Sequence, residues 1–523
     1  MNGAESLQRT LLNCGVDTCF MNPGTSEMHF VAALDNVPGM RSVLTLFEGV
    51  ATGAADGYGR MTETPAATLL HLGPGLANGM ANLHNARRAA SPIVNIVGDH
   101  ATYHRKYDAP LTSDAEGMAA TVSKWVKVSQ SANDVGRDAA EAVARSVEPQ
   151  RGVCTLVLPA DTAWGEADGP AQPPPPATPM TIDTELSHVA AAALRGEGRH
   201  VLLIGGTALL SEGLEAAARI AAKTGAEIFC DTITARMERG AGRVKIRRLP
   251  YFPEAVEQTL EGTTTLVLAG TRSPVAFFAY PDKSSDLTPR GVNPIQIASP
   301  SDDPVSALRT LAEVLDAPPF KSIAQTACAE LALPALPTGD LTVDNIGKTI
   351  GALLPEHAVI CDDSATSGVQ PFVHTATSQP HDWLLVTGGA IGQGMPVGIG
   401  AALARPDNKV ICLEGDGSAM YTIQSLWTQA RENLDVTNIV FSNRSYAILA
   451  IEYKRLRGTT PGTRAHDMLD LTRPDLDFVK MAEGMGVEAF RCETLDDFNS
   501  RFAYCMQERG PRLIEVILPP HRG

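Results

Sequence analysis

The sequence lacks an excess of basic residues. It contains 43 lysines and arginines against 59 aspartates and glutamates, which gives a formal net charge of -16 at pH 7. Nucleic-acid-binding proteins neutralise phosphates with clustered lysine and arginine side chains. The densest basic stretch, residues 243–248, is more typical of a solvated loop or strand face. We therefore expect no nucleic-acid partner.

Long apolar runs and paired cysteines are also missing. No stretch reaches the roughly 18 consecutive apolar residues of a membrane-spanning helix. Residues 1–9 are polar, unlike an export signal. The nine cysteines are scattered and include no Cys-x-x-Cys pair, which is typical of reduced thiols and not of a disulfide framework or a zinc site. The sequence therefore predicts a cytoplasmic protein without membrane contact.

Two proline-rich segments divide the chain, whose 523 residues are too many for one hydrophobic core. Residues 169–180 would form a stiff extended linker, and residues 333–340 a shorter break. In each of the three resulting segments, short apolar runs alternate with helix-like patterns, which is typical of doubly wound parallel sheets. We predict an α/β protein with three such domains, at residues 1–168, 181–332 and 333–523.

The first and third segments show the same order of predicted strands and helices, so the third looks like an echo of the first. Such a duplication would suit a ligand held between two related sheets. The expected strands are residues 18–21, 67–71 and 93–97 in the first segment, and residues 358–361, 410–413 and 436–441 in the third.

The middle segment contains Gly205 and Gly206 directly after an apolar run at residues 200–204. A glycine pair after a strand can approach a nucleotide phosphate, but alone it is a weak indication. A structural spacer is the interpretation that we favour, and flavin or nucleotide binding stays open.

Residues 415–418 read Gly-Asp-Gly-Ser and directly follow the apolar run at residues 410–413. Asp416 would then lie at the carboxyl end of a parallel strand, where such sheets bind ligands. Asn443 follows the next expected strand and would reach the same sheet edge. A carboxylate, an amide oxygen and a nearby backbone carbonyl are the hard oxygen ligands that Mg²⁺ prefers, with phosphate oxygens and water completing the octahedron.

The small residues of this turn favour a phosphate. Gly415 and Gly417 let the backbone approach it closely, and Ser418 could cap the helix expected at residues 423–431. Alone, Gly-Asp-Gly-Ser is a common turn. Together with the strand, the helix and the spaced asparagine, it predicts a metal-bound diphosphate.

This combination resembles the thiamin diphosphate fingerprint of the enzyme family that includes acetolactate synthases, benzoylformate decarboxylase and pyruvate decarboxylase. Residues 44–58 resemble the glutamate motif of that family, which makes Glu48 the expected catalytic acid. In the family, this glutamate hydrogen-bonds the aminopyrimidine ring and activates the cofactor. A lone glutamate is more often solvated, but Glu48 ends an apolar run and enters a helix of small residues, so we expect it to be partly desolvated.

The resemblance also implies further cofactor contacts. Residues 388–392 resemble the loop that holds the pyrimidine, where Gly389 would offer its carbonyl and Ile391 would be the bulky wedge beneath the ring. An ordinary core isoleucine is the alternative for Ile391. The implied cofactor-binding residues are Gly389, Ile391, Ser364, Thr366, Gly415, Gly417, Ser418 and Tyr446, and the implied metal ligands are Asp416, Asn443 and Ser445.

His71 and Thr25 would face the substrate by the same resemblance. His71 occupies the position of an active-site histidine in benzoylformate decarboxylase, and histidine can relay protons near neutral pH. A hydrogen-bonded histidine at a strand end is an equally simple interpretation. Thr25 falls where benzoylformate decarboxylase has a serine that meets the substrate carboxylate.

Two segments depart from the acetolactate synthase pattern. Pro110 and Leu111 stand where those synthases have a Phe-Gln pair, and residues 451–453 lack the tryptophan that selects the acceptor oxo acid. These departures weaken a role in valine and isoleucine synthesis. Residues 22–30 and 98–104 resemble a group of bacterial acetolactate-synthase-like large subunits.

We therefore expect a homodimer or homotetramer with its active site at the subunit interface. It would use thiamin diphosphate and Mg²⁺ to decarboxylate a 2-oxo acid, to join it to a second carbonyl compound through an enamine intermediate, or both. A true acetolactate synthase and a non-catalytic cofactor-binding homologue are the alternatives. FAD could occupy the central domain but is not expected.

Overall fold

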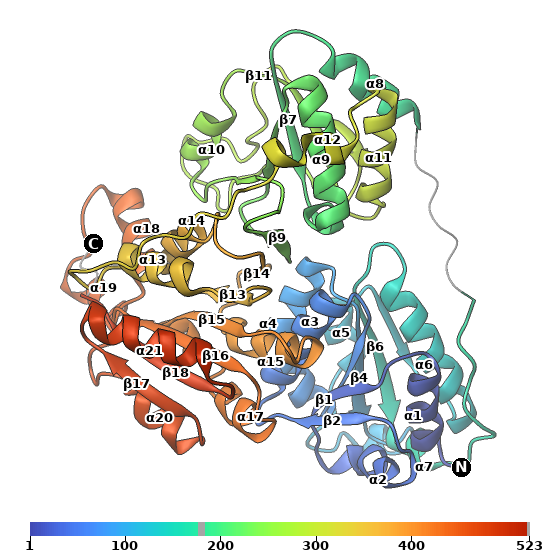
Figure 1. The fold of residues 1–523 in the computed structure, drawn as a ribbon. Coiled ribbons are helices and arrows are strands. Elements are labelled where there is room, and N and C mark those ends of the chain that lie inside the picture. The colour runs from blue at the N-terminus through green and yellow to red at the C-terminus, as the bar shows by residue number, and fades with distance from the viewer. Residues whose placement is uncertain (176–183, 520–523) are drawn as a thin grey trace.

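Three sheets, each covered by helices, make up the chain (Figure 1). The structure is a computed structural model that describes residues 1–175 and 184–519. Residues 176–180 of the expected linker lie outside the described residues, and its described part, residues 169–175, contains neither helix nor strand. The predicted α/β class with three predominantly parallel sheets is confirmed, while the domain boundaries stay a prediction.

The first sheet has six parallel strands in the order β2-β1-β3-β4-β6-β5. Its strands are β1 (Thr18–Asn22), β2 (Arg41–Leu44), β3 (Ala66–Leu70), β4 (Ile93–Asp99), β5 (Trp125–Val128) and β6 (Val153–Pro159). Its helices are α1 (Gly3–Asn13), η1 (Thr25–Glu27), α2 (Met28–Asn36), α3 (Glu48–Thr62), α4 (Leu72–Ala89), η2 (Arg105–Tyr107), α5 (Ala115–Ala120), α6 (Ala132–Val147) and α7 (Ala160–Trp164).

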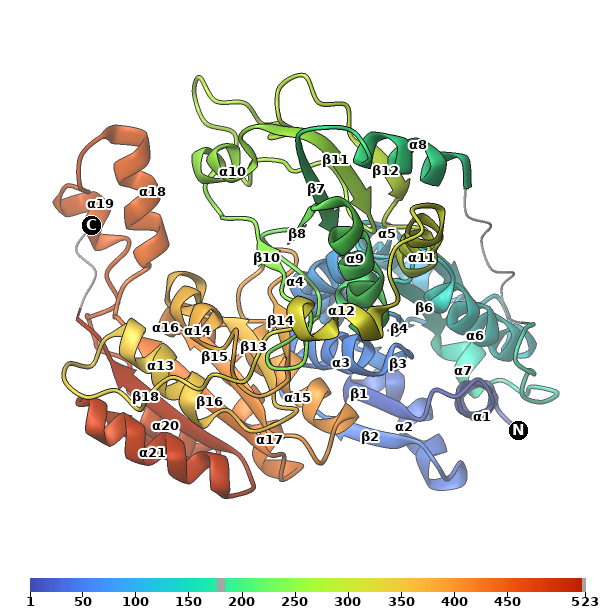
Figure 2. The ribbon, with the colours of Figure 1, turned by 45° about the horizontal axis from the view of Figure 1, so that its top comes forward.

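The central sheet lies above the other two domains (Figure 2) and has the order β10-β8-β7-β11-β12. Its strands are β7 (Arg199–Ile204), β8 (Glu227–Cys230), β10 (Arg247–Arg248), β11 (Thr263–Ala269) and β12 (Ile295–Ala298). Its helices are α8 (Thr184–Leu194), η3 (Gly206–Leu209), α9 (Ser211–Thr224), α10 (Pro253–Leu260), α11 (Pro304–Val314) and α12 (Phe320–Ala327). A Cβ added to Gly205 would lie 2.8 Å from the carbonyl oxygen of Gly270, so close backbone packing explains a glycine there.

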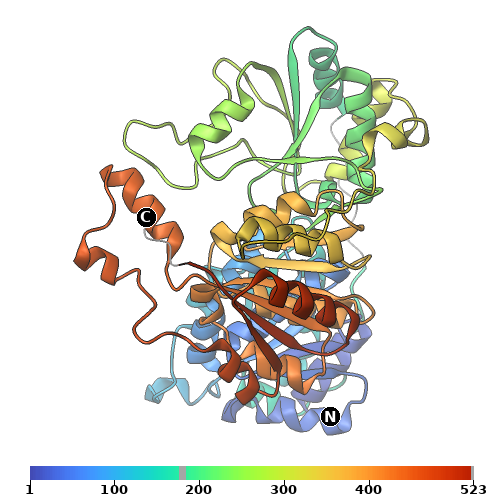
Figure 3. The ribbon, with the colours of Figure 1, turned by 60° about the vertical axis from the view of Figure 1, so that its left-hand side comes forward.

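The third sheet has the order β17-β18-β16-β15-β13-β14-β9. Its strands are β13 (Val359–Asp363), β14 (His381–Leu385), β15 (Val410–Gly415), β16 (Val436–Ser442), β17 (Glu488–Cys492) and β18 (Arg512–Ile517). Its helices are α13 (Val343–Leu353), η4 (Ala365–Gly368), α14 (Val369–His374), α15 (Gly394–Ala404), α16 (Asp416–Ala419), α17 (Ser425–Arg431), α18 (Ala447–Arg457), α19 (Thr463–Asp467), α20 (Phe478–Gly484) and α21 (Leu495–Gln507). Figure 3 shows α18 and α19, in orange-red, projecting from this domain.

One strand of the third sheet comes from the segment that we expected to form the central domain. β9 (Met237–Arg239) pairs with β14 in the antiparallel direction. The two neighbouring segments are therefore joined by a shared sheet edge as well as by the chain, which the sequence did not indicate.

The first and third sheets have the same strand order. When the strands of each domain are numbered along the chain, both orders run second, first, third, fourth, sixth and fifth, with β9 added to the third sheet. The prediction that the third segment echoes the first is confirmed. Apart from β9, each strand of one domain therefore has a counterpart in the other: β2 corresponds to β14 and β3 to β15, and the helices that follow β2 and β14 are α3 and α15.

The corresponding helices α3 and α15 pack against each other at the centre of the molecule (Figure 1). Small residues allow backbone-to-backbone contact: a Cβ added to Gly57 would collide with the carbonyl of Val397, and one added to Gly400 would collide with the carbonyl of Ala54. The glycines are required here because the helices touch with no room for a side chain.

The turn after β15 differs from its prediction in one respect. Ser418 lies inside the short helix α16, and α17 begins after Gln424 without a side-chain cap. The expectation that Ser418 caps a helix at residues 423–431 is wrong, because the chain already turns into helix at Asp416. Among the described residues, no helix is both long and apolar enough to cross a membrane.

Candidate active site

Glu48 begins α3 at the carboxyl end of β2 and is 7% exposed. Its Oε2 atom accepts a hydrogen bond of 3.0 Å from the side-chain amide of Asn78. Gly75 lies between Glu48 and His71, since a Cβ added there would be 3.2 Å from Glu48 Oε1 and 3.2 Å from His71 Cβ. The structure thus brings these two predicted residues together and leaves no side chain between them.

His71 lies between β3 and α4 and is paired with Glu27, a residue whose role the sequence did not indicate. Glu27 is 3% exposed, and its Oε2 atom lies 2.7 Å from His71 Nδ1. The same carboxyl group accepts hydrogen bonds from Gly24 N at 2.9 Å and from Ser26 Oγ at 2.6 Å. An ionised carboxylate can only accept, so in this pairing Nδ1 would carry the proton and Nε2 would be the other ring nitrogen available to a ligand.

Thr25 is exposed at the start of η1, directly after β1. It therefore lies in the same turn as Glu27, at the edge of the sheet that also carries Glu48 and His71. The side chains predicted to handle protons and substrate all come from the carboxyl ends of β1, β2 and β3.

Asp416 follows β15 and is 3% exposed. Its carboxylate accepts backbone hydrogen bonds from Arg444 at 2.5 Å and from Gly417 at 2.8 Å. Burial raises the pKa of Asp416 to about 6, and these two N–H groups oppose the rise. The turn at residues 443–445 is thereby held against Asp416.

The other predicted metal and diphosphate residues surround the same turn. Asn443 Oδ1 accepts a hydrogen bond of 3.0 Å from Ser445 N. The Tyr446 ring packs on Gly417, where an added Cβ would collide with it. Within the described residues, no group of three or more His, Cys, Asp or Glu side chains could hold a metal. A metal at Asp416 would therefore need amide, carbonyl, phosphate or water oxygens as its other ligands.

Ser364 and Thr366 lie after β13 in the same domain. Ser364 is 2% exposed, and its hydroxyl and N–H groups both donate to Asp362 Oδ1, at 2.6 and 3.1 Å. Its hydroxyl proton is therefore already engaged. Thr366 lies in η4 and is half-buried.

Two further acids are buried beneath the Asp416 turn. Burial raises the pKa of Asp363 to about 7, although its Oδ2 atom accepts the N–H groups of residues 392 and 393 at 2.7 and 2.8 Å. Glu414 is 1% exposed, and neither of its carboxyl oxygens has a hydrogen-bond partner in the described part of the chain. Burial, followed by the nearby Asp363, raises the pKa of Glu414 well above its usual value. Burial therefore raises the pKa of all three acids, Asp416, Asp363 and Glu414.

The loop at residues 388–392 shows alternating hydrogen bonding. The N–H and C=O groups of residues 388, 390 and 392 bond to side chains of the protein. In the described residues, those of Gly389 and Ile391 have no protein partner. Gly389 is exposed, with φ at +75°, and Ile391 is half-buried. The backbone groups of residues 388, 390 and 392 are thus held by the protein, while those of Gly389 and Ile391 are available to a ligand.

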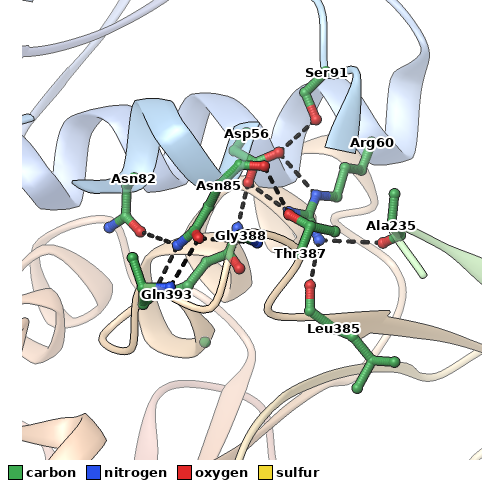
Figure 4. A network of polar contacts seen from close by, with 12 residues as sticks. Asp56, Arg60, Asn82, Asn85, Ser91, Ala235, Leu385, Thr387, Gly388 and Gln393 are labelled. Atoms are coloured by element: carbon green, nitrogen blue, oxygen red, sulfur yellow. Dashed lines mark hydrogen bonds and ion pairs between the residues drawn. The ribbon is translucent and has the colours of Figure 1, made fainter. Parts of the chain in front are cut away.

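A buried network ties this loop to the rest of the molecule (Figure 4). Asp56, which is 0% exposed, accepts from Arg60 Nη2 at 2.6 Å and from Gln393 Nε2 at 2.5 Å. Arg60 Nη1 donates to the carbonyl of Leu385 at 2.8 Å and to that of Ala235 at 3.2 Å. All three segments of the chain therefore meet at this network.

The predicted residues form two groups in different domains. Glu48, His71 and Thr25 belong to the first sheet, and the remaining predicted residues belong to the third. In the described part of the chain, no hydrogen bond or ion pair joins a member of one group to a member of the other.

Two family models match the domains that carry these groups. The model described as "Thiamine pyrophosphate enzyme, N-terminal TPP binding domain" matches residues 1–121, and "Thiamine pyrophosphate enzyme, C-terminal TPP binding domain" matches residues 366–516. The chain belongs to the thiamine pyrophosphate enzyme family. Thiamine pyrophosphate is another name for thiamin diphosphate, so the resemblance stated from the sequence is confirmed.

Members of this family align with nearly the whole chain. The Mycobacterium tuberculosis protein named "Putative acetolactate synthase large subunit IlvX" is 53% identical over 521 residues, which is 99% of each chain. Benzoylformate decarboxylase of Pseudomonas aeruginosa is 28% identical over 96% of each chain. A solved thiamine diphosphate-dependent 4-hydroxybenzoylformate decarboxylase from Rhodococcus jostii shares the fold, with a TM-score of 0.83, 24% identity and 100% of each chain covered.

The residues present fit the family's cofactor. The free carbonyl of Gly389 and the free N–H of Ile391 are able to bond a heteroaromatic ring, and Ile391 has the apolar side chain that the resemblance implies beneath such a ring. The Asp416 turn offers an ionisable carboxylate next to glycine backbone, which suits a metal-bound diphosphate.

Proposed function

We propose that this protein is a Mg²⁺-dependent thiamin diphosphate enzyme that decarboxylates a 2-oxo acid, joins it to a second carbonyl compound, or both. The observation that carries the proposal is the division of the site between two domains of identical strand order. One domain presents Glu48 and His71 at its strand ends, and the other presents Asp416 and the free backbone groups of the loop at residues 388–392.

Third-domain residues would hold the cofactor. Asp416, the amide oxygen of Asn443 and a carbonyl at Ser445 would bind Mg²⁺ and, through it, the diphosphate. Gly389 and Ile391 would hold and shape the pyrimidine end. The remaining contacts would come from Gly415, Gly417, Ser418, Ser364, Thr366 and Tyr446. Bound thiamin diphosphate supplies the nucleophilic carbon that attacks the keto group of the substrate.

First-domain residues would move protons and orient the substrate. Glu48, buried and held by Asn78, would exchange a proton with a ring nitrogen of the cofactor. His71, held by Glu27 through Nδ1, would deliver or accept a proton at Nε2. The exposed hydroxyl of Thr25 would bond the substrate carboxylate. Each role needs a side chain near the carboxyl end of a strand of the first sheet, and the positions of Glu48, His71 and Thr25 support these roles.

A second subunit would complete each site. The family resemblance implies a homodimer or homotetramer in which Glu48 of one subunit serves the cofactor held by another. All nine cysteines are free, which supports the cytoplasm as the compartment.

The choice between a lyase and a transferase needs a direct assay. Purified protein with Mg²⁺ and thiamin diphosphate is incubated with pyruvate, benzoylformate and longer aliphatic 2-oxo acids, while CO₂, aldehyde and acetolactate are measured. We expect CO₂ release from at least one 2-oxo acid. A complete lack of turnover across the panel would contradict the proposal.

Acetolactate synthase is the second candidate, favoured by the name of the 53% identical relative. Pro110 and Leu111 argue against it, because they replace the Phe-Gln pair implied for such synthases. Brisk acetolactate formation from pyruvate would overturn that argument. A non-catalytic homologue is opposed by the buried, hydrogen-bonded Glu48, since cofactor binding alone has no need of that acid.

A further inference from the structure

We propose that Asn85, assisted by Asn82, is a positioning residue for the cofactor. It fixes the loop at residues 388–392 so that the backbone groups of Gly389 and Ile391 face the pyrimidine ring. The inference rests on the proposed function, because it assumes that this loop holds the pyrimidine.

Asn85 belongs to a row of asparagines on helix α4. Asn78, Asn82 and Asn85 are spaced by four and three residues, so they share one helix face. Asn82 is 3% exposed and Asn85 is 0% exposed. Asn78 bonds Glu48, while Asn82 donates to the carbonyl of Gly49 at 2.8 Å. The same face that holds the catalytic acid therefore also reaches the pyrimidine loop.

The Asn85 side chain bonds the loop as a neighbouring strand would (Figure 4). Its Nδ2 atom donates to the carbonyl of Ala390 at 2.7 Å. Its Oδ1 atom accepts from Gly388 N at 3.1 Å and from Ala390 N at 3.2 Å. One side chain thereby satisfies three backbone groups of residues 388 and 390, while among the described residues the backbone groups of Gly389 and Ile391 have no partner.

Other side chains complete the protein side of the loop. His84 Nε2 lies 3.1 Å from the carbonyl of Gly388. The carbonyl of Gly392 accepts from Asn82 Nδ2 at 3.3 Å and from Thr422 Oγ1 at 3.0 Å. Since every second residue is held in this way, the loop is ordered before a ligand arrives, and binding does not have to order it.

The chemistry of the contact requires an amide. Asn85 presents a donor and an acceptor in one plane, while aspartate lacks the donor and alanine lacks both. Without Asn85, three backbone groups of residues 388 and 390 would lose their partners. Gly389, with φ at +75°, has no side chain to restrict rotation of its peptide groups, so its carbonyl could then turn away from the ligand.

Isothermal titration calorimetry of the full chain tests the proposal. Thiamin diphosphate with Mg²⁺ is titrated into wild type, Asn85→Ala and Asn85→Asp, and inorganic diphosphate with Mg²⁺ is titrated as a probe of the Asp416 end alone. Asn95→Ala is the matched control. Asn95 is 0% exposed in β4 and bonds Thr68 at 2.7 Å and Thr155 at 2.9 Å, away from the loop.

We expect Asn85→Ala to weaken thiamin diphosphate binding at least about tenfold, because buried groups lose their partners. Asn85→Asp, which keeps both acceptor bonds, should lie between Asn85→Ala and wild type, and it carries the test if the alanine variant does not fold. Affinity for inorganic diphosphate should be unchanged in both, and Asn95→Ala should bind thiamin diphosphate within about threefold of wild type.

Wild-type affinity for thiamin diphosphate in both Asn85 variants would overturn the inference, as would an equal loss of affinity for inorganic diphosphate. Failure of the wild type itself to bind thiamin diphosphate would instead overturn the proposed function. The two failures are therefore distinguishable.

Discussion

The first and third domains have the same strand order but present different chemistry at their strand ends. After β3 the first domain has His71, and after the corresponding β15 the third has Asp416. After β2 the first has the acid Glu48, and after β14 the third has the loop at residues 388–392. In the proposed function, the first domain would offer side chains that exchange protons, while the third would offer backbone groups for the cofactor and a carboxylate for the metal.

One strand topology can therefore supply both halves of a site when different residues follow its strands. The helices that follow the compared loops, α3 and α15, still pack against each other through glycine. Both domains contribute a helix to this contact in the same way, while the residues just before α3 and α15 differ in their chemistry.

The largest effect is expected for Glu48→Gln, which removes the proton-exchanging group of the first domain. Turnover should fall at least about 100-fold, because general acid-base groups contribute about that much or more. Cofactor affinity should change little, since the third domain holds the diphosphate. Steady-state kinetics and calorimetry measure the two quantities, with exposed Glu257→Gln as the control. Equal losses of turnover and affinity would contradict the division.

Gly57→Ala and Gly400→Ala test the shared helix contact. Each should destabilise the protein by about 1–3 kcal/mol, because the added methyl group collides with backbone of the opposite helix. Thermal unfolding measures the loss. Gly484→Ala is the control, since an added Cβ there meets nothing within 4 Å. If both variants matched this control, the close approach of α3 and α15 would be wrong.

Asp363→Asn tests the buried acid at the end of β13. Burial raises the pKa of Asp363 from 3.8 to about 7, so the folded state holds its proton more tightly than the unfolded state. Its stabilising contribution is complete below pH 3.8 and is lost as the pH rises through 7. Cofactor-free wild type should therefore be less stable at pH 7 than at pH 5, and Asp363→Asn should reduce that difference by about 1–2 kcal/mol.

Thermal unfolding at both pH values checks this expectation, with exposed Asp340→Asn as the control. An unchanged pH dependence in Asp363→Asn would show that this carboxyl group is ionised in the folded protein.

The smallest effect is expected for Glu27→Gln, which changes the acid in η1 that pairs with His71. It should lower kcat about fivefold, because a charge-assisted bond to His71 becomes a neutral one. In a His71→Asn background, the same change should have no further effect on kcat, as a double-mutant cycle would show. An additive loss would mean that Glu27 acts independently of His71.

Much of the fold could be predicted because strands are short apolar runs with polar ends. β15 begins at Val410 and β16 at Val436, as expected, and both merely extend further than predicted. The pairing of β9 with β14 could not be predicted, because a strand of three residues carries too little sequence pattern to indicate the sheet that it joins. The prediction that Ser418 caps a helix is wrong because α16 already begins two residues earlier, at Asp416.

The site was predicted where one contiguous motif carries it and missed where distant residues support it. Asp416 and Glu48 stand in recognisable local patterns. Glu27 pairs with a histidine 44 residues away, and Asn85 bonds Ala390 across 305 residues. Such partners become visible through the fold, although the row of asparagines on one face of α4 is a pattern that could have drawn attention.

We propose that each active site combines the proton-exchanging residues of one subunit's first domain with the cofactor-binding residues of another subunit's third domain. Glu48→Gln and Asp416→Ala should each be nearly inactive alone. Co-expressed with different tags and purified through both, mixed dimers contain one intact site of two, so we predict about half of wild-type turnover. Mixed dimers as inactive as either parent would contradict the claim.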